Sequence, residues 1–379
     1  MRLLIVGTGG RANRHAIEFS KITGVKIVGA VDVEAARLKA YAAKYDIEHA
    51  FASLEEAITW GQFDAAANVT SDRAHYPTTI ALIAAGKHVL CEKPLAENYE
   101  QAQEMATAAE RAGLIAMVNF SYRDEAILQK AHDMVLSGEI GNVRHLDGSF
   151  LQSWLVFAEW KNDPKWLWRL STKHGSNGVL GDLGIHVLDC AAFAAGSPIE
   201  RVFARLKAFE KAPDNRIGEY ELDANDSLAM TVELENGAMG VIQASRWATG
   251  FSNELKLRLF GDKGALEVLS TWTPTSESSI LRACLGENIH SGVWREIAVE
   301  ELATNIYSCF VKGVETGKNV EPSFRYAANL QRVVDLAIQT DRQRIELDVR
   351  DAGSQHHEHS ALNQDGADAR PYQKRSEPA

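Results

Sequence analysis

Two side chains suited to proton transfer stand four residues apart in one glycine-rich segment. Asp182 and His186 lie in NGVLGDLGIHVLDCAAF (177–193), and on a helix this spacing places them on one face. Histidine is the side chain best suited to accept a proton near neutral pH. The glycines place both groups close to a helix start. An ordinary helix ion pair would also explain this spacing.

Lys93 and Pro94 follow a short apolar run in the segment AGKHVLCEKPLAEN (85–98). The run predicts a strand, and residues from Leu95 onward predict a helix. Loops at the carboxyl ends of parallel strands are where open α/β sheets bind ligands. Proline fixes its own φ and restricts the residue before it, so Lys93 would be held in an extended or turn geometry. A solvated strand end with a turn proline is the alternative.

A glycine-rich turn near the N-terminus predicts a dinucleotide site. The turn consists of Gly7, Thr8, Gly9, Gly10, Arg11 and Ala12, between an expected strand and an expected helix. In this fingerprint Gly7 permits the tight turn, Gly9 lets the backbone approach a pyrophosphate, and Ala12 allows close helix–strand packing. The pyrophosphate would lie at the positive end of the helix.

Asp32 ends the next expected strand, at the distance from the turn that suits the acid binding the adenine ribose hydroxyls. A carboxylate there would repel a ribose phosphate, which favours NAD over NADP. Arg37 follows in AARLKAYAAKY, where a solvated helix residue is favoured over a phosphate ligand. A glycine turn with an unrelated surface aspartate is the remaining alternative.

The elements that would hold these residues change character near Asn119 to Arg123. Before this point short β-rich runs alternate with helical segments, which indicates βαβ units and a parallel sheet. After it, strand-like runs are joined by turn signals at residues 235–237 and 261–264, which indicates an antiparallel sheet. Helices are expected near residues 302–316 and 324–340.

Composition excludes several classes of protein. The chain has 379 residues, enough for two domains, and its formal net charge of −11 argues against nucleic-acid binding. No apolar run reaches the length of a membrane span, and the apolar start is too short for a signal peptide. The four cysteines form no CxxC pair, which favours a reducing compartment and a cytoplasmic location. No metal site is predicted, because His356, His357 and His359 lie in a tail of disordered composition.

Together these motifs resemble the Gfo/Idh/MocA oxidoreductase family, over roughly residues 1 to 350. The resemblance rests on Gly7 to Ala12, TSDRAH (70–75), GKHVLCEKPL (86–95), GEIGNV (138–143), WLWR (166–169) and GDLGIHVLD (181–189). One departure is Ser71–Asp72, where the family more often has Pro–Asn.

The resemblance implies a Rossmann NAD-binding domain over residues 1–122 and an α+β domain with a large, mainly antiparallel sheet over residues 123–350. Residues 351–379 would form a disordered tail. The open face of the sheet usually forms a dimer or tetramer interface in this family. The implied activity is hydride transfer between NAD, less favourably NADP, and a secondary hydroxyl of a cyclic sugar, anhydrosugar or polyol such as inositol.

The resemblance also implies roles for individual residues. Lys93 would lie beside the nicotinamide and bond the reacting oxygen, after a commonly cis bond to Pro94. His186 would be the general base, and Asp182 would hold the substrate or the imidazole. The cofactor would be bound by Gly7, Gly9, Gly10, Arg11, Asp32, Thr70, His75, Glu92, Asn119 and Trp168. The substrate would meet Lys93, Arg169, Asp182 and His186.

Tryptophans gather between the two halves of the expected site, at positions 154, 160, 166 and 168. An aromatic face stacks well on a sugar ring, although packing of a long loop is the favoured role for each except Trp168. Two other functions stay open. An NAD-retaining glycosidase would cleave by transient oxidation, and a non-catalytic nucleotide-sensing regulator would not need the Lys93, Asp182 and His186 set.

Overall fold

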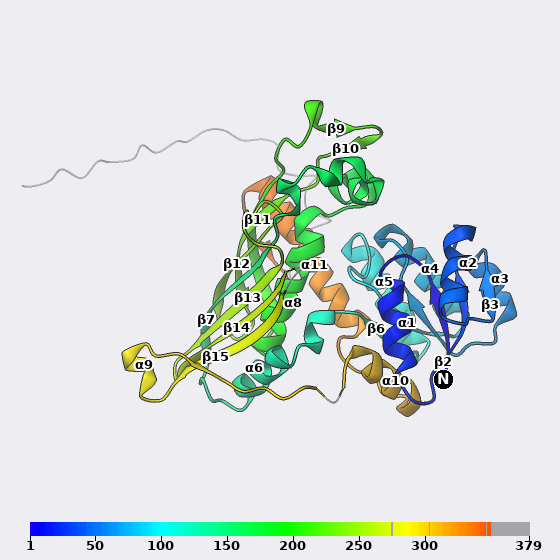
Figure 1. The fold of residues 1–379 in the computed structure, drawn as a ribbon. Coiled ribbons are helices and arrows are strands. Elements are labelled where there is room, and N and C mark those ends of the chain that lie inside the picture. Colours follow the sequence, from blue (N-terminus) through cyan, green and yellow to red (C-terminus); the bar gives the residue numbers. More distant parts are fainter. Residues whose placement is uncertain (274–275, 303, 346, 350–379) are drawn as a thin grey trace, which may run out of the picture.

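An open sheet of parallel strands forms the first part of the protein (Figure 1). The structure is a computed structural model and describes residues 1–273, 276–302, 304–345 and 347–349. The strands are β1 (Arg2–Val6), β2 (Lys26–Val31), β3 (His49–Phe51), β4 (Ala65–Asn68), β5 (His88–Cys91) and β6 (Ala116–Val118), in the order β3-β2-β1-β4-β5-β6. The helices are α1 (Ala12–Ser20), α2 (Ala35–Lys44), α3 (Leu54–Trp60), α4 (Asp72–Ala84) and α5 (Tyr99–Arg111). The order reverses between β1 and β4, where such sheets bind ligands.

Two local predictions for this sheet were incomplete or wrong. Strand β3 and helix α3 were not anticipated, because β3 has only three residues and offers no periodic signal. The helix after Lys93 begins at Tyr99 instead of near Leu95. The Asn98 side chain accepts a hydrogen bond from the backbone N–H of Gln101 and caps that helix. Leu95 is buried in the core as part of the preceding loop.

The second sheet is large and mainly antiparallel, as predicted. Its strands are β7 (Val143–Leu151), β8 (Ile199–Lys207), β11 (Ser227–Leu234), β12 (Met239–Ser245), β13 (Glu254–Gly261), β14 (Gly264–Thr273), β15 (Ser276–Leu285), β16 (Arg295–Glu296) and β17 (Leu347–Asp348). Strands β9 (Arg216–Ile217) and β10 (Tyr220–Glu221) pair separately. Both predicted hairpins, β11–β12 and β13–β14, are present. Strand β7 inserts between β12 and β13 and pairs in parallel with β12.

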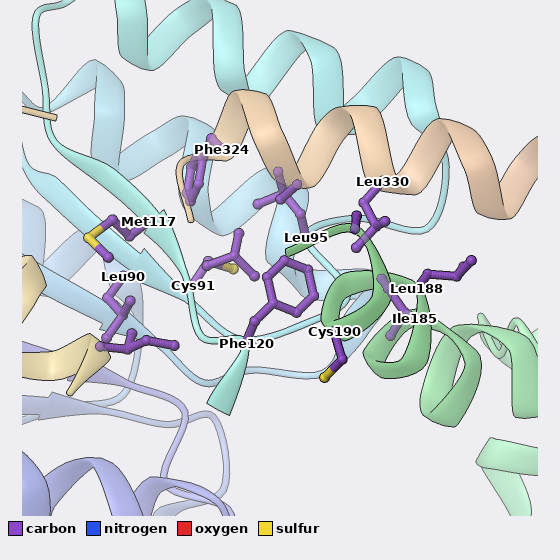
Figure 2. Packing of buried hydrophobic residues seen from close by; sticks show 14 of the residues in the cluster. Leu90, Cys91, Leu95, Met117, Phe120, Ile185, Leu188, Cys190, Phe324 and Leu330 are labelled. Carbon is purple, nitrogen blue, oxygen red and sulfur yellow. The ribbon is translucent and has the colours of Figure 1, made fainter. Parts of the chain in front are cut away.

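Helices cover one face of this sheet and bring the two parts of the molecule together. The helices on this face are α6 (Ala126–Leu136), α8 (Ile185–Ala194) and α11 (Phe324–Gln343), whereas α10 (Ile306–Thr316) lies beside the first sheet. Helix α11 packs against both β8 and α5, and α10 packs against α1, so the last helices return to the first sheet. Figure 2 shows Leu95 and Phe120 beside Ile185 of α8 and Leu330 of α11. One continuous core therefore joins the two sheets.

The segment between β7 and α8 is a series of short helical turns. These are η2 (Trp154–Val156), η3 (Glu159–Asn162), α7 (Pro164–Leu167), η4 (Trp168–Leu170), η5 (Thr172–His174) and the π-helical turn η6 (Leu180–Gly184). Three further short helices lie elsewhere, η1 (Ser121–Asp124) before α6, η7 (Pro213–Asn215) after β8 and α9 (Asn288–Ser291) after β15. No helix in the described ranges is long and apolar enough to cross a membrane. The predicted disordered tail and its histidines lie outside the described residues.

Candidate active site

A cavity of about 720 Å³ lies between the carboxyl ends of the first sheet and the second sheet. Of the residues predicted for the site, it is lined by Arg11, Thr70, His75, Glu92, Lys93, Trp168, Arg169, Asp182 and His186. The structure therefore brings the EKP motif and the Asp-x-x-x-His motif to one space. The remaining predicted residues belong to the glycine turn or to buried supports around it.

The glycine turn has the geometry that a dinucleotide requires. Gly7 has φ +89°, and a side chain there would come within 2.6 Å of the Val69 carbonyl oxygen. At Gly9 and Gly10 a Cβ would meet nothing within 4 Å, so the space beside them is open. No side chain caps the first turn of α1, and no acidic residue lies in it. No side-chain acceptor therefore competes with an anion at the positive end of this helix.

The Asp32 carboxylate is fixed by hydrogen bonds from Thr8 and Arg37. Its Oδ2 accepts from the backbone N–H and hydroxyl of Thr8, at 2.8 and 2.7 Å. Arg37 donates to both carboxylate oxygens, at 2.9 and 2.6 Å. Although burial opposes ionisation, Arg37 and Thr8 hold the pKa of Asp32 well below its ordinary value. Arg37 is an exposed residue of α2, as predicted, but its guanidinium also forms an ion pair with Asp32 that the sequence interpretation did not anticipate.

Glu92 is the centre of a buried network beneath the cavity. Its Oε1 lies 2.7 Å from His15 Nε2 and accepts from Asn119 Nδ2 at 2.7 Å. Asn119 also donates to the hydroxyl of Tyr307 on α10, at 3.1 Å. Although burial raises it, the pKa of Glu92 lies below its ordinary value because of His15, Arg11 and Asn119. Asn119 is fully buried and supports Glu92, whereas Glu92 itself reaches the cavity.

His75 supports the loop that carries Lys93. One ring nitrogen lies 2.7 Å from the Pro94 carbonyl oxygen and the other lies 3.1 Å from the Thr70 carbonyl oxygen. The side chain is fully buried, and the Lys93–Pro94 peptide bond is cis, as the resemblance implied. Both ring nitrogens of His75 are therefore occupied by the protein.

The Asp182 side chain forms ion pairs with three cationic side chains. Lys93 Nζ donates to its backbone carbonyl at 2.9 Å and to its Oδ1 at 3.1 Å. Arg169 donates to Oδ1 at 3.1 Å, and Arg246 donates to Oδ2 at 2.9 Å. Although burial raises it, Lys93, Arg169 and Arg246 hold the pKa of Asp182 well below its ordinary value. Three cationic side chains are therefore gathered around Asp182, and the Asp72 carboxyl group lies close enough to interact with Lys93 and Arg169.

His186 lies in an apolar environment close to this cluster. Its ring contacts Tyr122 edge to face, with centroids 4.9 Å apart. Burial first, and the charge of Lys93 second, lower the pKa of His186 well below its ordinary value, so the imidazole is neutral near pH 7. Within the described residues no hydrogen bond joins Asp182 to His186, and His186 Nδ1 is buried without a partner. Asp182 thus bonds Lys93 and not the imidazole.

Arg246 is the principal site residue that the sequence interpretation missed. Its side chain is fully buried and also donates to the backbone carbonyls of Gly178 and Arg169, at 3.2 and 3.3 Å. A signal was present, because Arg246 is in phase with Ile242 and Ala244, which point into the core. A charged residue at a core position of a strand indicates a buried ion pair.

The tryptophans divide between the two roles considered. Trp160 is buried in a small cluster with Leu155, Leu170 and other apolar residues, so it packs the loop. Trp154, Trp166 and Trp168 line the cavity. Arg169 lies over the Trp168 ring, 4.8 Å from its centroid. This contact and the ion pair with Asp182 fix Arg169 on the cavity wall.

Comparison with known proteins agrees with this geometry. A family model described as an oxidoreductase family with an NAD-binding Rossmann fold, GFO_IDH_MocA, matches residues 1–120. A model of the GFO/IDH/MocA C-terminal domain matches residues 128–267.

Similar proteins include dehydrogenases of known name. The chain is 26% identical to myo-inositol 2-dehydrogenase of Thermotoga maritima over 84% of this chain and 89% of that protein. It is 28% identical to levoglucosan dehydrogenase of Pseudarthrobacter phenanthrenivorans, but over only 52% of this chain and 53% of that protein. A solved structure of levoglucosan dehydrogenase with NADH and levoglucosan has a TM-score of 0.80, with 20% identity over 92% of this chain and 98% of that one. With both of its family models matched in order, this chain belongs to the GFO/IDH/MocA family of NAD-binding oxidoreductases.

Proposed function

We propose that the protein is an NAD-dependent dehydrogenase that oxidises a secondary hydroxyl of a cyclic sugar, anhydrosugar or polyol. The observation that carries this proposal is the convergence of Lys93, Asp182 and His186 on one cavity beside the glycine turn. The open space at Gly9 and Gly10 and the uncapped start of α1 fit a dinucleotide. NAD, when bound, supplies the hydride acceptor.

In this mechanism Lys93 and His186 have separate roles in the transfer of the hydroxyl proton. The Lys93 ammonium, oriented by Asp182, donates a hydrogen bond to the reacting hydroxyl and lowers its pKa. The neutral His186 accepts the hydroxyl proton, and in the reverse reaction the protonated ring returns it. With Nδ1 enclosed, Nε2 is the nitrogen that would meet the substrate. The cationic side chains around Asp182 stabilise the alkoxide character that develops as the proton leaves.

The test of the proposal is NADH formation by the purified protein, first with NAD and then with NADP, across sugars, anhydrosugars and inositols. We expect strong turnover on one of these groups with NAD. If NAD binds but no compound in the panel is oxidised, the dehydrogenase proposal is contradicted. Release of a free aglycone without net NADH would instead support the glycosidase alternative.

Asp32→Ala is expected to weaken NAD binding by roughly 10- to 100-fold, because a hydrogen bond to a charged group contributes about 1.5–3 kcal/mol. The preference for NAD over NADP should narrow at the same time. Dissociation constants measured by quenching of tryptophan fluorescence check both effects.

Arg37→Ala is the matched variant for this prediction. It frees both oxygens of Asp32 from the guanidinium. We expect NADP to bind more weakly than to the wild type, because an unneutralised carboxylate repels the ribose phosphate. An unchanged ratio of the two dissociation constants in both variants would contradict the role given to Asp32.

We also propose domain limits at residues 122 and 350, a cytoplasmic location and a dimeric or tetrameric state.

Association of copies is supported by strand β12. Met239 and Val241 on this strand are 59% and 46% exposed, on the face of the sheet that points away from the helices. Exposed apolar side chains on a sheet face favour burial against a second copy.

A further inference from the structure

The cavity extends well beyond the catalytic cluster, toward the ends of strands β7, β14 and β15. Its lining there includes Gln152, Asn253, Ser270, Trp272 and Glu277, together with Glu125 at the start of α6. None of these residues entered the mechanism. A substrate that reaches His186 from this side would contact them with the part of the molecule that does not react.

Glu125 is directed into this end of the cavity. It occupies the N-cap position of α6, yet its carboxylate makes no capping hydrogen bond. It accepts instead from the hydroxyls of Ser270 on β14, at 2.8 Å, and Ser279 on β15, at 3.4 Å. Burial raises the pKa of Glu125, and Glu277 acts in the same direction. A further negative charge beside this poorly solvated carboxylate would be unfavourable.

A row of neutral polar groups connects Glu125's end of the cavity with the catalytic histidine. Gln152 Nε2 donates to Asn253 Oδ1 at 2.7 Å, and Asn253 Nδ2 donates to the Tyr122 hydroxyl at 3.3 Å. The Tyr122 ring in turn contacts His186. Amides and hydroxyls both donate and accept hydrogen bonds, as the hydroxyls of a polyhydroxylated ring do.

The two ends of the cavity differ in their cations. Arg11, Lys93 and Arg169 lie at the cofactor and catalytic end, beside the carboxyl groups of Asp72, Glu92 and Asp182. The described lining residues at the sheet end include the carboxylates of Glu125 and Glu277 and no Lys or Arg. A phosphate or carboxylate group on the non-reacting part of a substrate would therefore face Glu125 and Glu277 without a cation to pair with.

We infer that the sheet end of the cavity is a subsite for a neutral, hydroxyl-bearing part of the substrate, in which Glu125 accepts a hydrogen bond from a sugar hydroxyl and phosphorylated sugars are excluded. This inference rests on the proposed sugar dehydrogenase function and restricts its substrate class. Trp272, half exposed at the rim, offers an aromatic face to the same ring.

The test compares methyl glucoside with glucose 1-phosphate and glucose 6-phosphate, two esters that carry the phosphate at different positions of the sugar. Binding to the NADH-saturated protein is followed by the fluorescence of the cavity tryptophans, and kcat/KM is measured in parallel. We expect the wild type to bind both phosphates at least about tenfold more weakly than the neutral glucoside, a difference of about 1.4 kcal/mol. Glu125→Gln should weaken binding of the glucoside and reduce this discrimination severalfold.

Glu287→Gln is the matched control, because it removes an exposed carboxylate beyond the opposite end of β15 and should leave the discrimination unchanged. Equal or tighter binding of either phosphate by the wild type, or unchanged discrimination in Glu125→Gln, would overturn the subsite. If the glucoside binds selectively but no hydride is transferred, the subsite stands and the dehydrogenase function fails. If hydride is transferred without discrimination, the function stands and the subsite fails.

Discussion

Replacement of Lys93 by methionine is expected to lower kcat for sugar oxidation by roughly 10²- to 10⁴-fold, the range for loss of a positioned acid–base group. Methionine keeps the apolar stem but removes the ammonium that binds the carbonyl and carboxylate of Asp182. Because the glycine turn and Asp32 are untouched, the dissociation constant of NADH should change little. Steady-state kinetics and fluorescence titration separate the two effects, and near-normal turnover would contradict the role of Lys93.

The same variant should move the pH dependence of the reaction. In the wild type, the pKa of His186 is lowered by burial and then by Lys93, so the neutral base persists as the pH falls below the ordinary histidine range. Removing the Lys93 charge raises that pKa, and the acidic limb of kcat/KM should therefore shift to higher pH. His186→Gln is the control, because it has no ring to titrate and should lose this limb together with most of its turnover.

The sequence was informative about the fold where a pattern is repeated. Alternating strands and helices predicted the parallel sheet, and turn signals at residues 235–237 and 261–264 predicted two hairpins of the second sheet. It was uninformative where an element is short or non-local. Strand β3 has three residues, and the position of β7 in the middle of the second sheet depends on pairing with strands about 100 residues later in the chain.

The same distinction holds for the candidate site. Local motifs were sufficient to select Lys93, Asp182 and His186 as residues of one cavity. They could not show that Asp182 pairs with Lys93 and two arginines, because these three partners come from three separate segments of the chain. Nor could they show that Arg37 folds back onto Asp32, since a residue on an amphipathic helix is ordinarily solvated. Ion pairs between distant segments depend on the tertiary structure, and the spacing of residues within one motif carries no information about them.

Replacement of Asp182 by asparagine is expected to lower the free energy of unfolding by about 3 kcal/mol, near the low end for removal of one partner of a buried ion pair. The low end applies because the Asp182 side chain is 23% exposed to the cavity, whereas the side chain of Arg246 is fully buried. Turnover should fall as well, since Lys93 loses the carboxylate that orients it. Urea unfolding followed by tryptophan fluorescence measures the stability, and wild-type stability in this variant would contradict the argument.

A double-mutant cycle with Arg246→Met separates the two consequences of losing Asp182. If the instability arises from the uncompensated charge of Arg246, Asp182→Asn combined with Arg246→Met should be destabilised by less than the sum of the single variants. Turnover of the double variant should nevertheless stay low, because Lys93 still lacks its partner. Additive losses of stability would instead mean that Asp182 and Arg246 do not interact energetically. Recovery of turnover with stability would mean that Asp182 acts on the fold alone and has no part in positioning Lys93.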